Sequence, residues 1–246
     1  MYNSFARGYD LLTDNIAYKQ FADYYEEIFA RQGIKPELVL DLGCGTGTVT
    51  AMMANRGYDM IGVDISEEML NIARTKTDKV LFLQQDMTDF ELYGTVDVIY
   101  SALDAVNYVL SKKDLKRMFR LVKNYLNFGG IFIFDINTPH KFQNVLDGNT
   151  FVYDKESVYC VWQNELDKRS EICTFFIDLF YREKGTLFER FYEEHYERAY
   201  EPGELGTMLK EAGLKLLGTY DAFSFRRPKP ASERIFMVAQ KIGESR

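Results

Sequence analysis

A glycine-rich segment follows the first strongly apolar stretch of the chain. It reads Asp41-Leu-Gly-Cys-Gly-Thr-Gly47 and lies between a predicted strand at 37–42 and a predicted helix at about 48–56. Glycine lets a backbone turn sharply and approach a ligand closely, and the first turn of the next helix offers amide groups with no partner inside the helix. Because Gly-x-Gly-x-Gly alone is also typical of an ordinary turn, its meaning depends on the residues beside it.

Two carboxylates follow the next two predicted strands. Asp64 comes directly after the strand at 59–63, and Asp86 follows the strand at 80–84. In a doubly wound sheet these strand ends lie on the same edge as the glycine loop. Asp64 can accept hydrogen bonds from both hydroxyls of a ribose, and Asp86 from the exocyclic amine of adenine. Either aspartate alone could be a turn residue, but together with the loop they predict a site for a nucleoside cofactor.

The spacing of the glycines distinguishes between nucleoside cofactors. The nicotinamide fingerprint Gly-x-Gly-x-x-Gly would place its third glycine at Thr48, and an NTPase loop would place a Lys-Ser/Thr pair after the glycines. Neither is present. The loop instead resembles the Asp-x-Gly-x-Gly-x-Gly motif of class I S-adenosylmethionine-dependent methyltransferases. Successive motifs of that family resemble VLDLGCGTG at 39–47, GVDISEEML at 62–70, QQDMTDF at 84–90 and SALDAVNYVL at 101–110.

The resemblance, which covers about 37–140 and 203–241, implies S-adenosylmethionine as the cofactor and a role for each matching residue. Asp41 and the loop backbone would lie near the amino-acid end of the cofactor, and Asp64 would hold its ribose. Ile65 and Met69 would lie close to the adenine. The remaining implied contacts are Gly43, Cys44, Gly45 and Gly47 in the loop, Asp86 and Met87 at the adenine ring, and Leu103 and Asp104 near the methionine portion and the acceptor.

Aromatic residues near the N-terminus suggest a further contribution to the cofactor site. Aromatic faces attract a sulfonium cation, and in enzymes similar to this one the N-terminal segment folds over the cofactor. We therefore expect Tyr9 and Tyr18 to contact the cofactor. Packing of these rings in the hydrophobic core is the alternative.

Methyl transfer from a sulfonium is an in-line displacement, so the enzyme mainly aligns the acceptor and excludes water. A general base is needed only when the acceptor must lose a proton. His195 is the candidate base, with Glu193 and Glu197 on the same face of its predicted strand. Asn107 and Tyr108 are candidates for orienting the acceptor. The alternative for His195 is a surface histidine paired with acids. The alternative for Asn107 and Tyr108 is that they cap a loop.

The acceptor is less well defined than the cofactor. The segment after the fourth strand, Ser101-Ala-Leu-Asp104, lacks the Asp/Asn-Pro-Pro-aromatic motif of nucleic-acid amino methyltransferases, and no Pro-Cys pair is present for cytosine chemistry. These absences favour a small-molecule acceptor, with RNA and protein acceptors left open. Basic residues at 112–123 and 226–229 would favour RNA if they formed one patch. A non-catalytic S-adenosylmethionine-binding regulator is the competing class.

The predicted elements would place these residues at one edge of a sheet. Strands and helices alternate through residue 135, which indicates an α/β domain with a parallel sheet. Three β-rich stretches without helices follow, and then a helix at 204–212 and strands at 214–221 and 233–241. We expect a Rossmann-like domain, 1–140 and 201–246, with an inserted antiparallel β subdomain, 141–200, over the substrate. The family resemblance implies the strand order 3-2-1-4-5-7-6 with strand seven antiparallel. The remaining expected elements are helices at 15–33, 67–76 and 112–127 and strands at 96–101, 131–135, 158–164, 171–181 and 187–196.

Composition limits the class and the location of the protein. The 246 residues carry a net charge of −7, which argues mildly against broad nucleic-acid binding. Three cysteines and two histidines predict neither a disulfide scaffold nor a zinc site, so we expect no metal. No secretory signal or membrane-spanning run is evident, and a cytoplasmic protein is expected. Aromatic residues concentrate at 1–29 and 142–200 and net negative charge at 141–200, a cover that would suit an amine-bearing acceptor. The oligomeric state is not predicted.

Overall fold

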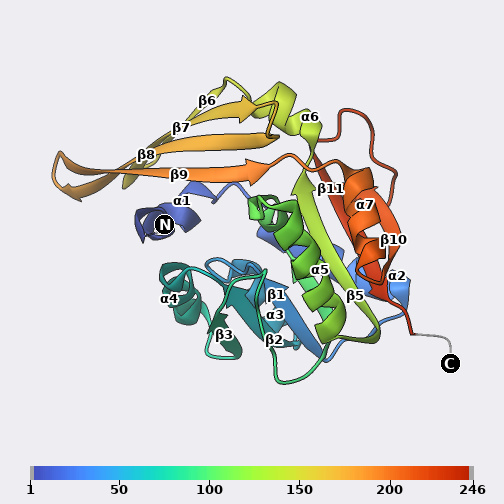
Figure 1. Ribbon diagram of the computed structural model, residues 1–246. Helices are drawn as coiled ribbons and strands as arrows, with labels where there is room; N and C mark the ends of the chain where they lie inside the picture. Colours follow the sequence, from blue (N-terminus) through green and yellow to red (C-terminus); the bar gives the residue numbers. More distant parts are fainter. Residues whose placement is uncertain (1–2, 244–246) are drawn as a thin grey trace.

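The computed structural model describes residues 3–243, which form two sheets (Figure 1). The larger sheet has seven strands in the order β10-β11-β5-β4-β1-β2-β3. β1 to β5 are parallel, and β11 is antiparallel to both of its neighbours. This order confirms the predicted class I methyltransferase topology. The strands are β1 (Leu38–Leu42), β2 (Asp59–Asp64), β3 (Val80–Gln84), β4 (Val96–Ser101), β5 (Leu126–Asn137), β10 (Leu214–Asp221) and β11 (Arg234–Lys241).

Helices cover both faces of this sheet, because the central strands β1, β4 and β5 carry apolar residues on both faces. In β5, Phe132 and Phe134 pack with α5 (Lys112–Tyr125) and α7 (Pro202–Glu211). Ile131 and Ile133 point to the opposite face, where α2 (Tyr18–Gln32) and α3 (Thr48–Asn55) lie. Both faces are therefore dry, as expected for a sheet with parallel crossover connections. α4 (Glu67–Lys76) packs beside β2 and β3.

The second sheet is antiparallel and has the order β6-β7-β8-β9; it is called the inserted sheet below. Its strands are β6 (Thr150–Asp154), β7 (Val158–Asp167), β8 (Ile172–Lys184) and β9 (Leu187–Arg198). β8 and β9 are joined by a tight turn at Gly185, whose φ is +60°. The connection from β7 to β8 spans residues 168–171. The short elements η1 (Ala105–Tyr108), α6 (Pro139–Lys141) and η2 (Phe142–Leu146) complete the chain.

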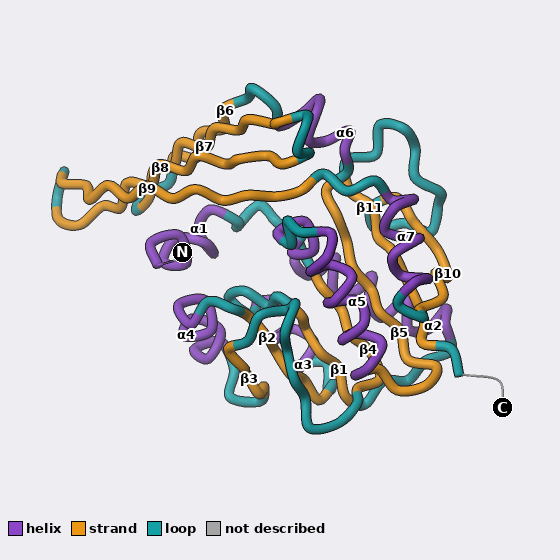
Figure 2. Tube along the Cα trace, viewed as in Figure 1, coloured by secondary structure: helices purple, strands orange, loops and turns teal. Residues whose placement is uncertain are grey.

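Helix α1 (Asn3–Leu12) lies beneath the inserted sheet in Figures 1 and 2 and was not predicted. Phe5, Ala6 and Leu12 share one buried cluster with the inward residues of β7 and β8. Gly8 permits this close approach, since a Cβ atom there would overlap the ring of Tyr181. The glycine that weakens the helical pattern in the sequence is thus what allows α1 to pack.

Other local predictions met a mixed outcome. Ser66 and Ser111 cap α4 and α5, accepting from the amides of Met69 and Asp114 at 3.2 and 3.3 Å. The helix expected at 15–33 begins at Tyr18. β5 begins at Leu126, ahead of the strand expected at 131–135, and β6 was not predicted. The division into domains at 140/141 and 200/201 stays a prediction.

Candidate cofactor and acceptor site

The glycine loop turns from β1 into α3 along a path that only glycine follows easily. Gly43, Gly45 and Gly47 have φ angles of +83°, +53° and +69°. The amides of Gly43 and Cys44 donate to the carbonyl of Val63 at 2.8 and 2.9 Å, so the loop is tied to the end of β2. A Cβ atom on Gly43 would lie 2.8 Å from Met87 Cε and 3.0 Å from Ala105 Cβ. A side chain at Gly43 would therefore clash with these two residues, so the loop can pass this close to them only with glycine there.

Asp64 both shapes the loop and faces the space beside it. Its Oδ2 accepts a 2.7 Å hydrogen bond from the amide of Gly45, and its Oδ1 accepts from the amide of Ser66 at 2.9 Å. Burial raises the pKa of Asp64, although these amides act in the opposite direction. Each oxygen keeps one further lone pair for a ligand. The sequence predicted a ligand contact for Asp64, but it did not predict the hydrogen bonds by which Asp64 holds the loop.

A cavity of about 500 Å³ opens beside Asp64. It contacts the ends of β2 and β3, α1, the start of α5, and β9. A smaller space of about 60 Å³ adjoins it and shares Tyr9, Gly43 and Gly45 with it. Residues of the predicted site that line the larger cavity are Tyr9, Gly43, Gly45, Asp64, Ile65, Met69, Asp86, Met87, Tyr108 and His195. Those that line the smaller one are Tyr9, Tyr18, Asp41, Gly43, Cys44, Gly45 and Leu103.

Asp86 closes a turn and also lines the cavity, so its predicted contact with adenine stays a prediction. Its Oδ1 accepts from the amide and the hydroxyl of Thr88, at 2.7 and 2.8 Å, which closes a turn after β3. The residue also lines the larger cavity, together with Met87. On the neighbouring strand end, Ile65 is exposed, whereas Met69 is buried. This end of the cavity combines apolar walls with carboxylates, as a purine ring and a ribose would require.

Asp41 lies at the bottom of the smaller space and is 1% exposed. The hydroxyl of Thr50 donates to its Oδ2, whereas Oδ1 is buried without a hydrogen-bond partner among the described residues. Burial raises the pKa of Asp41 to about 7. A buried carboxylate oxygen of this kind fits a ligand that carries a hydrogen-bond donor and a positive charge.

Hydrogen bonds to Asp135 hold the loop after β4 in a strained backbone conformation. Leu103 and Asp104 both have left-handed φ angles, +57° and +55°. Their amides donate to the two oxygens of Asp135, at 2.8 and 3.0 Å, and Arg234 pairs with both Asp104 and Asp135. Leu103 reaches the smaller cavity, but Asp104 lines neither. The ion pair with Arg234 therefore explains the presence of a carboxylate at Asp104 better than ligand binding does.

Asn107 and Gly47 also lie outside both cavity linings. The amide nitrogen of Asn107 donates to the carbonyls of Arg198 and Asn137, at 2.8 and 3.3 Å, and its oxygen accepts from the amide of Asn137 at 3.0 Å. Because both ends of this buried side chain are bonded to backbone, it joins η1 to β5 and β9. Asn107 is thus a positioning residue rather than one that contacts an acceptor. Gly47 begins α3, where a Cβ atom would press on Ala73.

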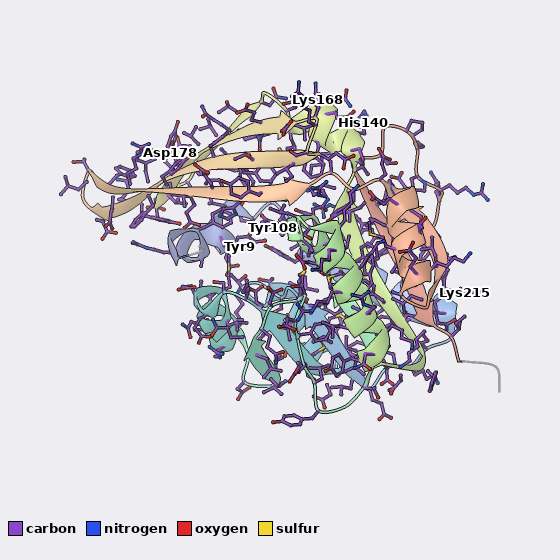
Figure 3. The ribbon with its side chains drawn as sticks, viewed as in Figure 1. Tyr9, Tyr108, His140, Lys168, Asp178 and Lys215 are labelled. Atoms are coloured by element: carbon purple, nitrogen blue, oxygen red, sulfur yellow. The ribbon has the colours of Figure 1, made fainter. Side chains whose placement is uncertain are left out.

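His195 reaches the larger cavity from β9. Its Nε2 lies 3.1 Å from Oε2 of Glu193, and both side chains are almost fully buried. The ring of Phe5 packs edge-on against His195 with centroids 4.8 Å apart, and Tyr108 does so from 6.2 Å. Figure 3 shows Tyr9 and Tyr108 in the region between the inserted sheet and the larger sheet. Two distant segments, η1 and α1, thus meet at one histidine.

Several lining residues were not predicted. Phe5, Asp114 and Tyr196 line the larger cavity, and Thr46 lines the smaller one. No lysine or arginine lines either cavity within residues 3–243, whereas Asp64, Asp86 and Asp114 do. The alternating pattern of β9 was available in the sequence, but which face it turns to the cavity was not.

Three of the basic residues at 112–123 that were considered for RNA have acidic partners. Lys112 pairs with Glu204 at 2.7 Å, Lys116 with Glu211 at 2.8 Å, and Arg117 with Asp89. This face of α5 is therefore a solvated helix face with acidic partners. No helix of the described chain is long and apolar enough to cross a membrane. Within the same residues, no group of three or more potential metal ligands is found.

Comparison with known proteins gives consistent results along the whole chain. The profile of the methyltransferase-domain family matches residues 39–130. A putative methyltransferase of Bacillus subtilis, YqeM, is 32% identical over 245 residues, covering 98% of this chain and 97% of the relative. The crystal structure of an S-adenosylmethionine-dependent methyltransferase from Clostridium acetobutylicum superposes with a TM-score of 0.89 at 34% identity, covering 98% and 99% of the two chains. The sugar N-methyltransferase KedS8 of Streptoalloteichus shares the fold at 20% identity with a TM-score of 0.79, covering 99% and 93%.

Proposed function

The chain belongs to the class I S-adenosylmethionine-dependent methyltransferases, and from that premise we propose that it methylates a small molecule bearing an amino group. The observation that carries the acceptor class is the charge of the cavity. Its described lining holds three aspartates and a histidine paired with Glu193, and no cation. Such a lining attracts an amine and repels a carboxylate or a phosphate.

The residues present fit the cofactor. Asp41 Oδ1, which has no hydrogen bond from residues 3–243, suits the amino group of the methionine portion, and Asp64 has lone pairs left for the ribose hydroxyls. Ile65, Met69 and Met87 would enclose the adenine, with Asp86 at its edge. Tyr9 and Tyr18 border the smaller space, so their rings would lie near the cofactor's cationic end. When bound, the cofactor supplies an activated methyl group on a sulfonium.

The chain's own residues would then align the acceptor and take up its proton. The cavity walls exclude water from the line of displacement. Nε2 of His195 lies 3.1 Å from Glu193 Oε2, and with a proton held there Nδ1 would be the nitrogen that takes up the acceptor's proton. Tyr108, beside His195, would orient the acceptor. The bound cofactor would supply the methyl group to the acceptor nitrogen, with the electron pair of the broken C–S bond left on sulfur as S-adenosylhomocysteine.

The proposal is tested by measuring S-adenosylhomocysteine formation with matched panels of small amines, alcohols and carboxylates, and with RNA and protein from a cell extract. Turnover confined to amines supports the proposal. A kinetic preference for carboxylates contradicts the amine class, and methylation of RNA or protein alone contradicts the small acceptor. Cofactor binding without turnover in any panel would favour a regulatory role.

The role of His195 is tested separately by His195→Gln, with the chain's other histidine as the control. We expect a loss in kcat of about 10²- to 10⁴-fold, the range for a lost general base, with an unchanged cofactor Kd. His140 lies on α6 and lines neither cavity, so His140→Gln should retain wild-type kcat.

The three cysteines are free thiols, which is consistent with the proposed cytoplasmic location.

A further inference from the structure

Helix α1 joins the two halves of the site. On one side, Asp10 accepts from Thr46 Oγ1 of the glycine loop at 2.7 Å and pairs with Lys76 Nζ of α4 at 2.6 Å. On the other side, the amide of Phe5 donates to Oε1 of Glu193 on β9 at 2.8 Å. The same ten-residue helix therefore contacts the segment that would hold the cofactor and the strand that carries His195.

The contact with Glu193 follows from the helix geometry. Phe5 lies in the first turn of α1, where an amide has no acceptor inside the helix and the helix dipole favours a negative charge. Glu193 supplies that charge through Oε1, while its Oε2 lies 3.1 Å from His195 Nε2. One carboxylate thus connects the end of α1 to the candidate base, and the ring of Phe5 packs on the same imidazole.

We propose that α1 is the element that assembles the base: docking of α1 on the glycine loop through Asp10 orients His195 through Glu193. Glu193 is then a positioning residue, and the base is aligned only when α1 covers the cofactor-binding loop. This inference depends on the proposed function of His195. It couples occupancy of the cofactor site to readiness of the acceptor site through α1, which contacts both the glycine loop and β9.

A double-mutant cycle tests this coupling, because Asp10 and Glu193 lie on opposite sides of α1. Asp10→Asn, Glu193→Gln and the double variant are compared at saturating cofactor. We expect each single change to lower kcat about tenfold or more, and the double variant to lose little beyond the larger single loss. An Asp10 that merely clamps the loop would raise the cofactor KM and leave kcat unchanged. That result, or losses that multiply in the double variant, would overturn the proposal.

Two further measurements separate this inference from the proposed function. If His195→Gln retains wild-type kcat, His195 is not the base and the proposed function of this residue is wrong. If His195→Gln loses most of its kcat but Glu193→Gln retains wild-type kcat, only the proposed role of α1 is wrong. Glu189→Gln, an exposed change on the same strand, is the matched control and should behave as wild type. Hydrogen exchange of residues 3–12 gives a readout that needs no turnover. It should slow when S-adenosylhomocysteine is added, and Glu193→Gln should accelerate it; exchange that responds to neither contradicts the docking.

Discussion

Thr50 donates a 2.5 Å hydrogen bond to Oδ2 of Asp41 and leaves the second oxygen of this buried carboxylate without a partner among the described residues. The pair joins the end of β1 to α3 directly below the glycine loop. Because one oxygen is satisfied by the protein and the other is not, Asp41 is held in place and still available to a ligand. Its ionisation should therefore govern cofactor binding.

The affinity for S-adenosylmethionine should rise with pH through neutrality. Burial raises the pKa of Asp41 to about 7, so the cofactor-free protein holds a proton there at pH 6, and the cofactor's ammonium group must displace it. Calorimetry should show about tenfold tighter binding at pH 8 than at pH 6. Asp41→Asn should bind more weakly, with an affinity independent of pH in this range. A flat wild-type profile would contradict the assignment.

The same shift predicts the stability of the cofactor-free protein. A carboxyl whose pKa is higher in the folded than in the unfolded state binds its proton more tightly when folded. This group's contribution to the free energy of unfolding is therefore largest below about pH 4, falls between pH 4 and 7, and is constant above. Urea titrations of wild type and Asp41→Asn should differ in this slope; parallel slopes would argue against it.

Asp64→Ala should weaken cofactor binding by about 1–3 kcal/mol, because ribose hydroxyls and the amides of Gly45 and Ser66 lose their acceptor. Calorimetry and thermal unfolding should both report the change, since the residue also pins the loop. Asp59→Ala is the matched control, as Asp59 is exposed at the other end of β2. Wild-type affinity in Asp64→Ala would count against the placement of the ribose.

Arg234→Met should destabilise the protein by about 3–5 kcal/mol, because it leaves the buried carboxylate of Asp135 and the partly buried one of Asp104 without this cation. Although burial opposes it, Arg234 lowers the pKa of Asp104, which shows how closely the two charges interact. Differential scanning calorimetry should record a Tm lowered by roughly 10 °C. Arg227→Met, in an exposed loop, should leave the Tm unchanged. A Tm near wild type for Arg234→Met would mean that the two carboxylates do not depend on it.

Gly43→Ala should abolish measurable cofactor binding more completely than Gly45→Ala. Both glycines have positive φ, so both substitutions strain the loop, but only at Gly43 would the new methyl group meet Met87 and Ala105. A Cβ atom at Gly45 has open space around it. The comparison of the two affinities by calorimetry thus isolates the steric term, and equal losses would show that strain alone decides.

Most of the larger sheet could be predicted because its signals are local. An apolar run that ends at glycine or aspartate is enough to locate β1, β2 and β3 and to bring Asp64 and Asp86 to one edge. The family resemblance added the strand order, which the structure confirms. Of the residues named for the cofactor, Gly47 and Asp104 lie outside both cavity linings, while the others border one or both. Their roles stay predictions until binding is measured.

What the sequence by itself determined is the cofactor loop, because left-handed glycines and carboxylates at strand ends follow from short-range backbone requirements. Only the tertiary structure decided what surrounds it. Phe5 meets Glu193 across 188 residues, and Asn107 is bonded between β5 and β9 instead of facing an acceptor. Periodicity shows that a strand has two faces, but which face is covered, and by which distant segment, depends on packing between elements. The base, its positioning carboxylate and α1 are brought together by that packing alone.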